Sequence, residues 1–187
     1  MKKLLMTLAI LAIAVPAMAS DVVLLGVLDG PITGGLPKFI EVFVCNDVAD
    51  MSIYGLGSAN NGGGSNGQEF TFDAVAVSAG TSLFVASDDV QFPVFMGFAP
   101  DYVSSAANIY GDDAIELFCD GAVVDIYGEI DVDGTGQPWE YLDSWAKRSS
   151  GTGPDGTTFV IGSWTIPGPN VLDGHATNAD AEAQGVG

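Results

Sequence analysis

Residues 111–128 read GDDAIELFCDGAVVDIYG, and this stretch decides the fold class of the chain. Its two apolar runs, residues 114–119 and 122–127, are rich in β-branched and aromatic side chains, and only Asp120-Gly121 separates them. An Asp-Gly pair between two such runs is the strongest short signal for a β-hairpin, because both residues tolerate the positive φ angles of a tight turn. The stretch therefore predicts two antiparallel strands joined by a two-residue turn.

Short extended runs separated by turn residues continue along the rest of the chain. The chain contains 25 glycines, and it shows no sustained 3.6-residue repeat of apolar side chains. Strands at such spacing predict an antiparallel β-sandwich or barrel. The further predicted strands are residues 21–28, 38–45, 69–72, 82–86 and 157–161.

The first nineteen residues have the pattern of a secretory signal. Two lysines precede an apolar run at residues 4–15, and residues 17–19 (AMA) give the small-x-small pattern that signal peptidase requires. The apolar run is too short for a bilayer-spanning helix, which takes about 20 residues. We therefore expect a signal peptide over residues 1–19 with cleavage after Ala19, a secreted or periplasmic location, and no membrane span.

The rest of the chain is strongly acidic. The full sequence has a formal charge of −19, and removal of residues 1–19 leaves three basic residues against 24 acidic ones, a charge of −21. Such a surface repels nucleic-acid phosphates and anionic lipid headgroups, so direct nucleic-acid binding is not expected. The charge is typical either of a protein that stays soluble in salty surroundings or of one that collects divalent cations.

The two cysteines, Cys45 and Cys119, would reach an oxidising compartment, which favours a single disulfide between them. Simple alternation opposes this pairing, because Cys119 shares a strand face with Leu117 whereas Cys45 shares one with Glu41. A β-bulge would be needed to bring the two thiols together. The sequence leaves a disulfide and two free thiols open.

An acidic loop, residues 129–140 (EIDVDGTGQPWE), has the spacing of an EF-hand calcium loop, with Glu in place of the usual Asp at position 1. Calcium takes six to eight oxygen ligands, and alternate side chains of a tightly turned loop can aim theirs inward. The alternative is a plain solvated turn, since residues 123–127 read as a strand rather than a flanking helix. The predicted Ca²⁺ ligands are Glu129, Asp131, Asp133, Thr135 and Glu140.

Three aromatic residues, Trp139, Tyr141 and Trp145, follow this loop. They are candidates for a ligand-binding platform on which sugar rings or bases stack. The alternative is that they complete the hydrophobic core beside a long loop.

No catalytic arrangement stands out, and no enzyme activity is expected. The one histidine, His175, lies in the C-terminal segment, and the nucleophile elbow G-x-S-x-G is absent from the sequence. Residues 174–187 are rich in Ala, Asn, Asp and Gly and lack a hydrophobic face. We therefore expect a single domain at residues 20–168, followed by a flexible tail at residues 169–187.

Three stretches together resemble a bacterial lamin-tail domain: residues 26–63, residues 69–72 (EFTF) and residues 111–128. An early strand with Ile40-Glu41 is followed by Asn46 and the turn Asp50-Met51-Ser52. A later Gly-Asp precedes the strand with Ile115 and Leu117, then the Asp-Gly turn and a strand beginning Val-Val-Asp. The resemblance covers residues 21–164; the aromatic residue after the early turn is replaced near Tyr54-Gly55, and both cysteines are additions.

The resemblance implies an immunoglobulin-like β-sandwich and a non-catalytic module. Domains of this family resemble accessory parts of secreted or surface proteins, some of them attached to extracellular nucleases or phosphatases. The expected function is a secreted binding or structural module, possible partners being an extracellular protein or a polysaccharide. The alternatives are an accessory carbohydrate- or nucleic-acid-binding module beside a secreted hydrolase, and a small metal-dependent hydrolase.

Overall fold

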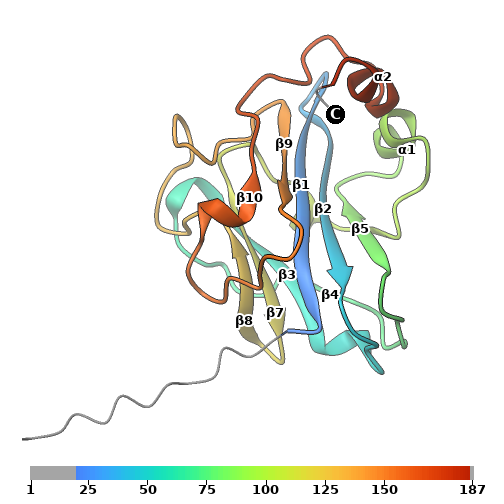
Figure 1. Ribbon diagram of the computed structural model, residues 1–187, viewed down its shortest axis with the longest axis vertical. Coiled ribbons are helices and arrows are strands. Elements are labelled where there is room, and N and C mark those ends of the chain that lie inside the picture. The colour runs from blue at the N-terminus through green and yellow to red at the C-terminus, as the bar shows by residue number, and fades with distance from the viewer. Residues whose placement is uncertain (1–19, 186–187) are drawn as a thin grey trace, which may run out of the picture.

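The computed structural model describes residues 20–185, which form a sandwich of two β-sheets (Figure 1). The predicted signal peptide over residues 1–19 lies outside the described residues. One sheet contains β1 (Val22–Ile32), β2 (Leu36–Val44), β5 (Ser82–Ala86), β6 (Tyr102–Val103), β9 (Ser144–Arg148) and β10 (Trp164–Thr165). The other contains β3 (Tyr54–Ala59), β4 (Phe70–Thr71), β7 (Ala114–Cys119) and β8 (Ala122–Tyr127).

The strand orders are β10-β9-β1-β2-β5-β6 and β4-β3-β7-β8. Neighbouring strands are antiparallel except β5 and β6, which run parallel. The prediction of an all-β sandwich is therefore confirmed. Within residues 20–185, none of the helices combines the length and the apolar character that a membrane-spanning segment requires.

The hairpin β7–β8 begins and ends where the sequence predicts it. Asp120 and Gly121 form its turn with positive φ angles of 49° and 77°. The pairing shifts register between Leu117 and Phe118, which marks a β-bulge. The hairpin contributes Ile115, Leu117 and Tyr127 to the buried layer between the two sheets.

The main core lies between the sheets and is closed by aromatic rings. The Tyr127 ring packs edge-on against Trp139, Tyr141 and Trp164, and its hydroxyl donates to the backbone oxygen of Trp139 at 2.5 Å. A buried polar group needs a hydrogen-bond partner, and the Tyr127 hydroxyl has one. The loop after β8 is thus part of the core.

A second hydrophobic cluster covers part of the outer face of the six-stranded sheet. Two short helices, α1 (Gln91–Met96) and α2 (Asn178–Ala183), pack there near the top of the molecule in Figure 1. The buried members of this cluster are Leu28, Phe39, Ala86, Phe92, Phe95, Leu172 and Ala181.

Over residues 169–185 the chain packs against the sandwich, where a flexible tail at residues 169–187 was expected. Leu172 and Ala181 are fully buried, and the Thr177 hydroxyl caps α2 by accepting from the Asp180 backbone N–H at 3.1 Å. Two isolated apolar residues give no hydrophobic periodicity, so the composition resembled that of a disordered segment. The apolar surface that they cover comes from α1 and the sheet, which lie far away in the sequence.

Other elements also differ from the sequence prediction. Residues 157–161 are not a strand; residue 161 begins a short 3-10 helix that leads directly into β10. The strands β3, β6, β9 and β10 were not predicted, and β1 continues through residues 29–32, beyond its predicted end at residue 28. The short 3-10 helices of the described chain are η1 (Met51–Ile53), η2 (Asn60–Gly62), η3 (Ser105–Ala107) and η4 (Ile161–Ser163).

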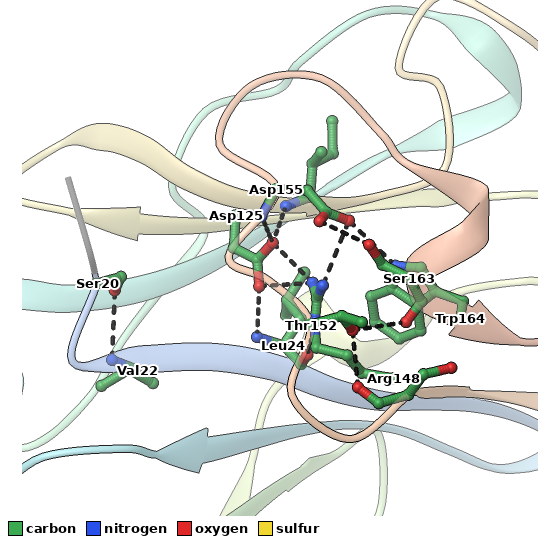
Figure 2. A network of polar contacts seen from close by, with 11 residues as sticks. Ser20, Val22, Leu24, Asp125, Arg148, Thr152, Asp155, Ser163 and Trp164 are labelled. Atoms are coloured by element: carbon green, nitrogen blue, oxygen red, sulfur yellow. Dashed lines mark hydrogen bonds and ion pairs between the residues drawn. The ribbon is translucent and has the colours of Figure 1, made fainter. Parts of the chain in front are cut away.

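A buried ion pair connects the two sheets, as Figure 2 shows. Arg148 of β9 places its Nη2 atom 2.7 Å from both carboxylate oxygens of Asp125 in β8. The Arg148 Nε–H donates to the backbone oxygen of Leu24 at 2.6 Å, and the Leu24 N–H donates to Asp125 at 2.9 Å. The pair therefore joins β8 of one sheet to β1 and β9 of the other.

The loop after β9 closes over this ion pair. The Asp155 backbone N–H donates to Asp125 at 2.8 Å, and the Asp155 carboxylate lies 3.3 Å from Arg148 Nη1. The same carboxylate accepts from the Ser163 hydroxyl at 3.0 Å, and the guanidinium lies over the Trp164 ring, 4.4 Å from its centroid. Each charge thus has several partners, which a buried charge needs.

Candidate functional site

Three loops meet around a cavity of about 350 Å³ at one end of the sandwich. The loop after β3 is joined to the loop after β8 by the Gly64 N–H, which donates to the Ile130 backbone oxygen at 2.9 Å. The segment before β7 is joined to the same loop by the Gly134 N–H, which donates to the Asp112 backbone oxygen at 3.0 Å. The cavity is lined by Asn61, Tyr110, Asp112, Thr135, Glu140 and Leu142.

Tyr110 is the aromatic residue of this cavity, and its side chain is 53% exposed. The Nζ atom of Lys38 lies 4.0 Å from the centroid of its ring. Lys38 itself is buried and pairs with Asp29 at 2.5 Å, while the second Asp29 oxygen accepts from the Gly111 N–H at 3.0 Å. A cation against the ring and a fixed neighbouring backbone hold Tyr110 at the cavity wall.

Polar side chains surround this ring. The Thr135 hydroxyl donates to Asp112 at 3.2 Å, and Glu140 accepts from the Gly136 N–H at 2.9 Å. These contacts orient both carboxylates and leave each with free acceptor sites, since a carboxylate offers about four lone-pair sites. Asn61 adds a side-chain amide, so the cavity presents hydrogen-bond donors and acceptors beside an exposed aromatic ring.

The buried Asp113 holds the base of the cavity together. Its two oxygens accept from the backbone N–H groups of Asn61 at 2.9 Å and Tyr110 at 2.8 Å. Burial raises the pKa of Asp113; the two N–H donors lower it, and the neighbouring Asp112 raises it further. The group therefore positions two residues of the cavity while lying wholly beneath the surface.

The structure does not bring the five predicted calcium ligands to one point. Within residues 20–185, no group of three or more His, Cys, Asp or Glu side chains could hold a metal ion. Asp133 is exposed and accepts from the Thr135 N–H at 2.9 Å, a bond that lowers its pKa. Glu129 and Asp131 are exposed, while Thr135 and Glu140 line the cavity. Calcium binding by this loop stays a prediction.

The predicted aromatic platform is also divided between two places. Trp139 and Tyr141 are buried in the main core, as the alternative interpretation held. Trp145 lies half-buried on the outer face of the six-stranded sheet. Tyr110, which does line the cavity, was missed, because nothing in the sequence around it distinguishes an exposed ring from a core ring.

The predicted disulfide between Cys45 and Cys119 is not formed, and both thiols are free. Cys45 follows β2 and is exposed, whereas Cys119 ends β7 in the other sheet and packs against the main core. The alternation of side chains, which opposed the disulfide, therefore agrees with the structure, and the expected oxidising compartment did not decide the pairing. Partial desolvation by the surrounding protein raises the pKa of each thiol.

Comparisons with known proteins add no relative: no family model, curated protein or solved structure matches the chain. The geometry of residues 20–185 therefore carries the functional inference.

Proposed function

We propose that this protein is an exported, non-catalytic binding module that holds a neutral, polyhydroxylated ligand, such as a polysaccharide segment, in the Tyr110 cavity. The observation that carries the proposal is the exposed Tyr110 ring, which stands among two carboxylates, a hydroxyl and an amide. An aromatic ring offers a flat apolar surface to the C–H face of a sugar. Carboxylates and amides around it can exchange hydrogen bonds with the sugar hydroxyls.

The charge of the chain supports a neutral ligand over a charged polymer. The full sequence contains 24 acidic and five basic residues, and Asp112 and Glu140 stand at the cavity itself. A polyanion such as a nucleic acid would meet repulsion at long range and at contact. A neutral glycan meets neither, so its affinity would depend on stacking and hydrogen bonds.

The fold agrees with the lamin-tail resemblance, which we retain as part of the proposal. A two-sheet sandwich that presents loops at one end supports a binding module of the immunoglobulin-like kind. His175 lies in the C-terminal segment, where its Nδ1 atom is 3.0 Å from the Asp180 carboxylate, whereas the polar groups that line the Tyr110 cavity are carboxylates, a hydroxyl and an amide. Such a set serves binding, and we propose no reaction for it.

A screen of neutral and acidic glycans against the chain beginning at Ser20, followed by calorimetry on the best ligand, tests this proposal. We expect Tyr110→Ala to weaken binding at least tenfold and Tyr110→Phe to retain most of it, because the ring surface is kept. Asp112→Asn and Glu140→Gln should each weaken binding several-fold. Phe98→Ala removes an exposed ring elsewhere and serves as the control.

Two results would overturn the proposal. One is a screen in which no neutral glycan binds; the other is a bound glycan whose affinity Tyr110→Ala and Phe98→Ala change equally.

A further inference from the structure

A second cavity, of about 340 Å³, lies on the outer face of the six-stranded sheet, on the part that α1 and α2 leave uncovered. We call it the outer-face pocket. Its floor comes from β1, β2, β5 and β9, and its rim comes from α2 and the end of α1. Its lining includes Gly26, Glu41, Phe84, Phe98, Trp145 and Lys147.

Strand register places the charged residues of this pocket in one row. Gly26 of β1 pairs with Glu41 of β2 on one side and with Lys147 of β9 on the other. Phe84 of β5 continues the row beyond Glu41. Because adjacent strands lie about 4.8 Å apart, the Cα atoms of Glu41 and Lys147 are separated by roughly 10 Å, with a glycine between them.

Gly26 keeps the centre of this row open. A Cβ atom built on it would lie 3.3 Å from a Glu41 carboxylate oxygen, so any side chain here would fill the space between the two charges. No ion pair in residues 20–185 joins Glu41 to Lys147. The two groups are nevertheless close enough for the charge of Lys147 to lower the pKa of the Glu41 carboxyl. An acid and a base therefore face a shared gap without closing it.

Apolar side chains form the rest of the pocket. Phe84 and Phe98 pack edge-on at 5.1 Å between ring centroids, and Met96 lies beside them. Trp145 belongs to the neighbouring row, opposite Leu28. On the rim, Glu182 accepts from the Asn178 side chain at 2.9 Å, so that carboxylate already has a partner within α2.

We propose that the outer-face pocket binds a small zwitterion with an apolar body. The ligand's ammonium lies against Glu41, its carboxylate lies against Lys147, and its apolar part lies on Phe84, Phe98 and Trp145. This class includes apolar amino acids and short peptides with free ends. It is a ligand distinct from the polyhydroxylated one of the Tyr110 cavity, and the two proposals stand or fall separately.

Charge matching favours this class over three others. A purely apolar ligand would desolvate Glu41 and Lys147 without giving either a partner, which is costly. A simple cation would leave Lys147 unmatched, and a simple anion would leave Glu41 unmatched in a protein that is already strongly acidic. The carboxyl of Glu41 has its pKa raised by burial, while the Ser82 hydroxyl and Lys147 lower it. An arriving ammonium would stabilise its charged form.

Three matched probes test the proposal on the chain beginning at Ser20 at neutral pH. L-phenylalanine carries both charges, its methyl ester lacks the carboxylate, and N-acetyl-L-phenylalanine lacks the ammonium. We expect phenylalanine, or the dipeptide glycyl-phenylalanine with its wider charge separation, to bind with a Kd of about 0.1–1 mM. For whichever binds, capping either end should weaken binding at least tenfold, as measured by titration with amide chemical shifts.

Variants then assign the two charges. Glu41→Gln should abolish the preference for the zwitterion over the N-acetyl probe, and Lys147→Met should abolish the preference over the ester. Gly26→Ala should weaken all binding by filling the gap. Asp73→Asn makes the same charge change at an exposed position away from the pocket and should leave the affinity unchanged.

The proposal is overturned if neither zwitterion binds at about 10 mM, if the capped probes bind as well as the zwitterion, or if Glu41→Gln behaves like Asp73→Asn. Amide spectra of each variant separate loss of binding from loss of folding. Tyr110→Ala should leave this binding intact, which distinguishes the outer-face pocket from the Tyr110 cavity.

Discussion

At the scale of single residues, buried charge is the feature of this chain with the largest consequences. Asp125 and Arg148 are both almost wholly buried, and each has partners on more than one strand. Taking such charges out of water is expensive, and their mutual attraction offsets that expense only while both are present. Removing one leaves the other stranded in the interior.

We therefore expect Arg148→Met to lower the free energy of unfolding by about 3–5 kcal/mol. Lys147→Met, one position away on the exposed face of the same strand, should change it by no more than about 0.5 kcal/mol. Urea unfolding of both variants measures the difference. Equal losses of unfolding free energy in the two variants would contradict the proposed role of the buried ion pair. The double variant Arg148→Met with Asp125→Leu should recover much of the loss seen with Arg148→Met alone.

Asp113 should make stability depend on pH. Burial raises the folded-state pKa of this carboxyl above the unfolded value of about 3.9. The protonated group therefore favours the folded state, so its contribution is complete below the unfolded pKa and is lost as pH rises through the folded one. The free energy of unfolding of the wild type minus that of Asp113→Asn should fall as pH rises above 4, with a slope of at most about 1.4 kcal/mol per pH unit. Urea unfolding at pH 4 to 7 measures this; a difference that grows with pH would contradict it.

Single residues also show what the sequence could not predict. Asp29-Gly30-Pro31 has the composition of a turn, yet Asp29 is buried against Lys38 and the strand continues. Local composition carries no information about a partner on the next strand. Tyr110 and Trp139 are chemically similar in the sequence, and only packing makes one exposed and the other buried.

At the scale of secondary-structure elements, the strands predicted at 82–86, 114–119 and 122–127 match β5, β7 and β8. Each is dominated by apolar, β-branched and aromatic residues and is bounded by turn residues, which is the signal that sequence patterns detect. β9 was missed because its five residues include Lys147 and Arg148, and α2 was missed because its packing surface lies elsewhere in the chain. The cavity was only half predicted, since Thr135 and Glu140 belong to it and Tyr110 and Asp112 were not named for it.

The attachment of α2 can be tested on one face of the helix. Ala181→Asp places a carboxylate at a fully buried position and should lower the free energy of unfolding by about 2 kcal/mol or more. Ala183→Asp adds the same charge two residues further on, at an exposed position, and should have an effect within about 0.5 kcal/mol. Denaturant unfolding and proteolysis of the C-terminal segment give the two readouts. Equal behaviour of the two variants would mean that α2 does not pack as described.

The positions of the two cysteines lead to a separate prediction. In the folded protein, Cys45 should react with a thiol reagent well before Cys119, because only Cys45 is exposed. A reductant should shift the free energy of unfolding by less than about 0.5 kcal/mol, whereas loss of a native disulfide from a small secreted domain costs about 2–5 kcal/mol. Mass spectrometry after timed alkylation checks the order, and absence of any titratable thiol in the purified protein would contradict the free state.

At the scale of the whole molecule, net charge should dominate the response to ions. A formal charge of −19 over 187 residues repels itself in the compact state, so added NaCl should raise the thermal midpoint by screening. If the loop at residues 129–140 binds Ca²⁺, CaCl₂ at matched ionic strength should raise it further, by an amount that corresponds to about 2.7 kcal/mol at 100 times the Kd. Asp131→Asn with Asp133→Asn should remove only the excess. If CaCl₂ raises the thermal midpoint no more than NaCl at the same ionic strength, the calcium prediction is wrong.

The two buried ion pairs have one more consequence. In residues 20–185 the basic side chains are Lys38, Lys147 and Arg148, and the ion pairs with Asp29 and Asp125 keep the first and last of these inside the protein. A trypsin-like protease, which must pull a basic side chain into its own pocket, can reach only Lys147, and that residue is fixed in the middle of a sheet. In the chain beginning at Ser20, the folded domain should therefore resist tryptic digestion, and an amine-reactive dye should label Lys147 and the α-amino group of Ser20.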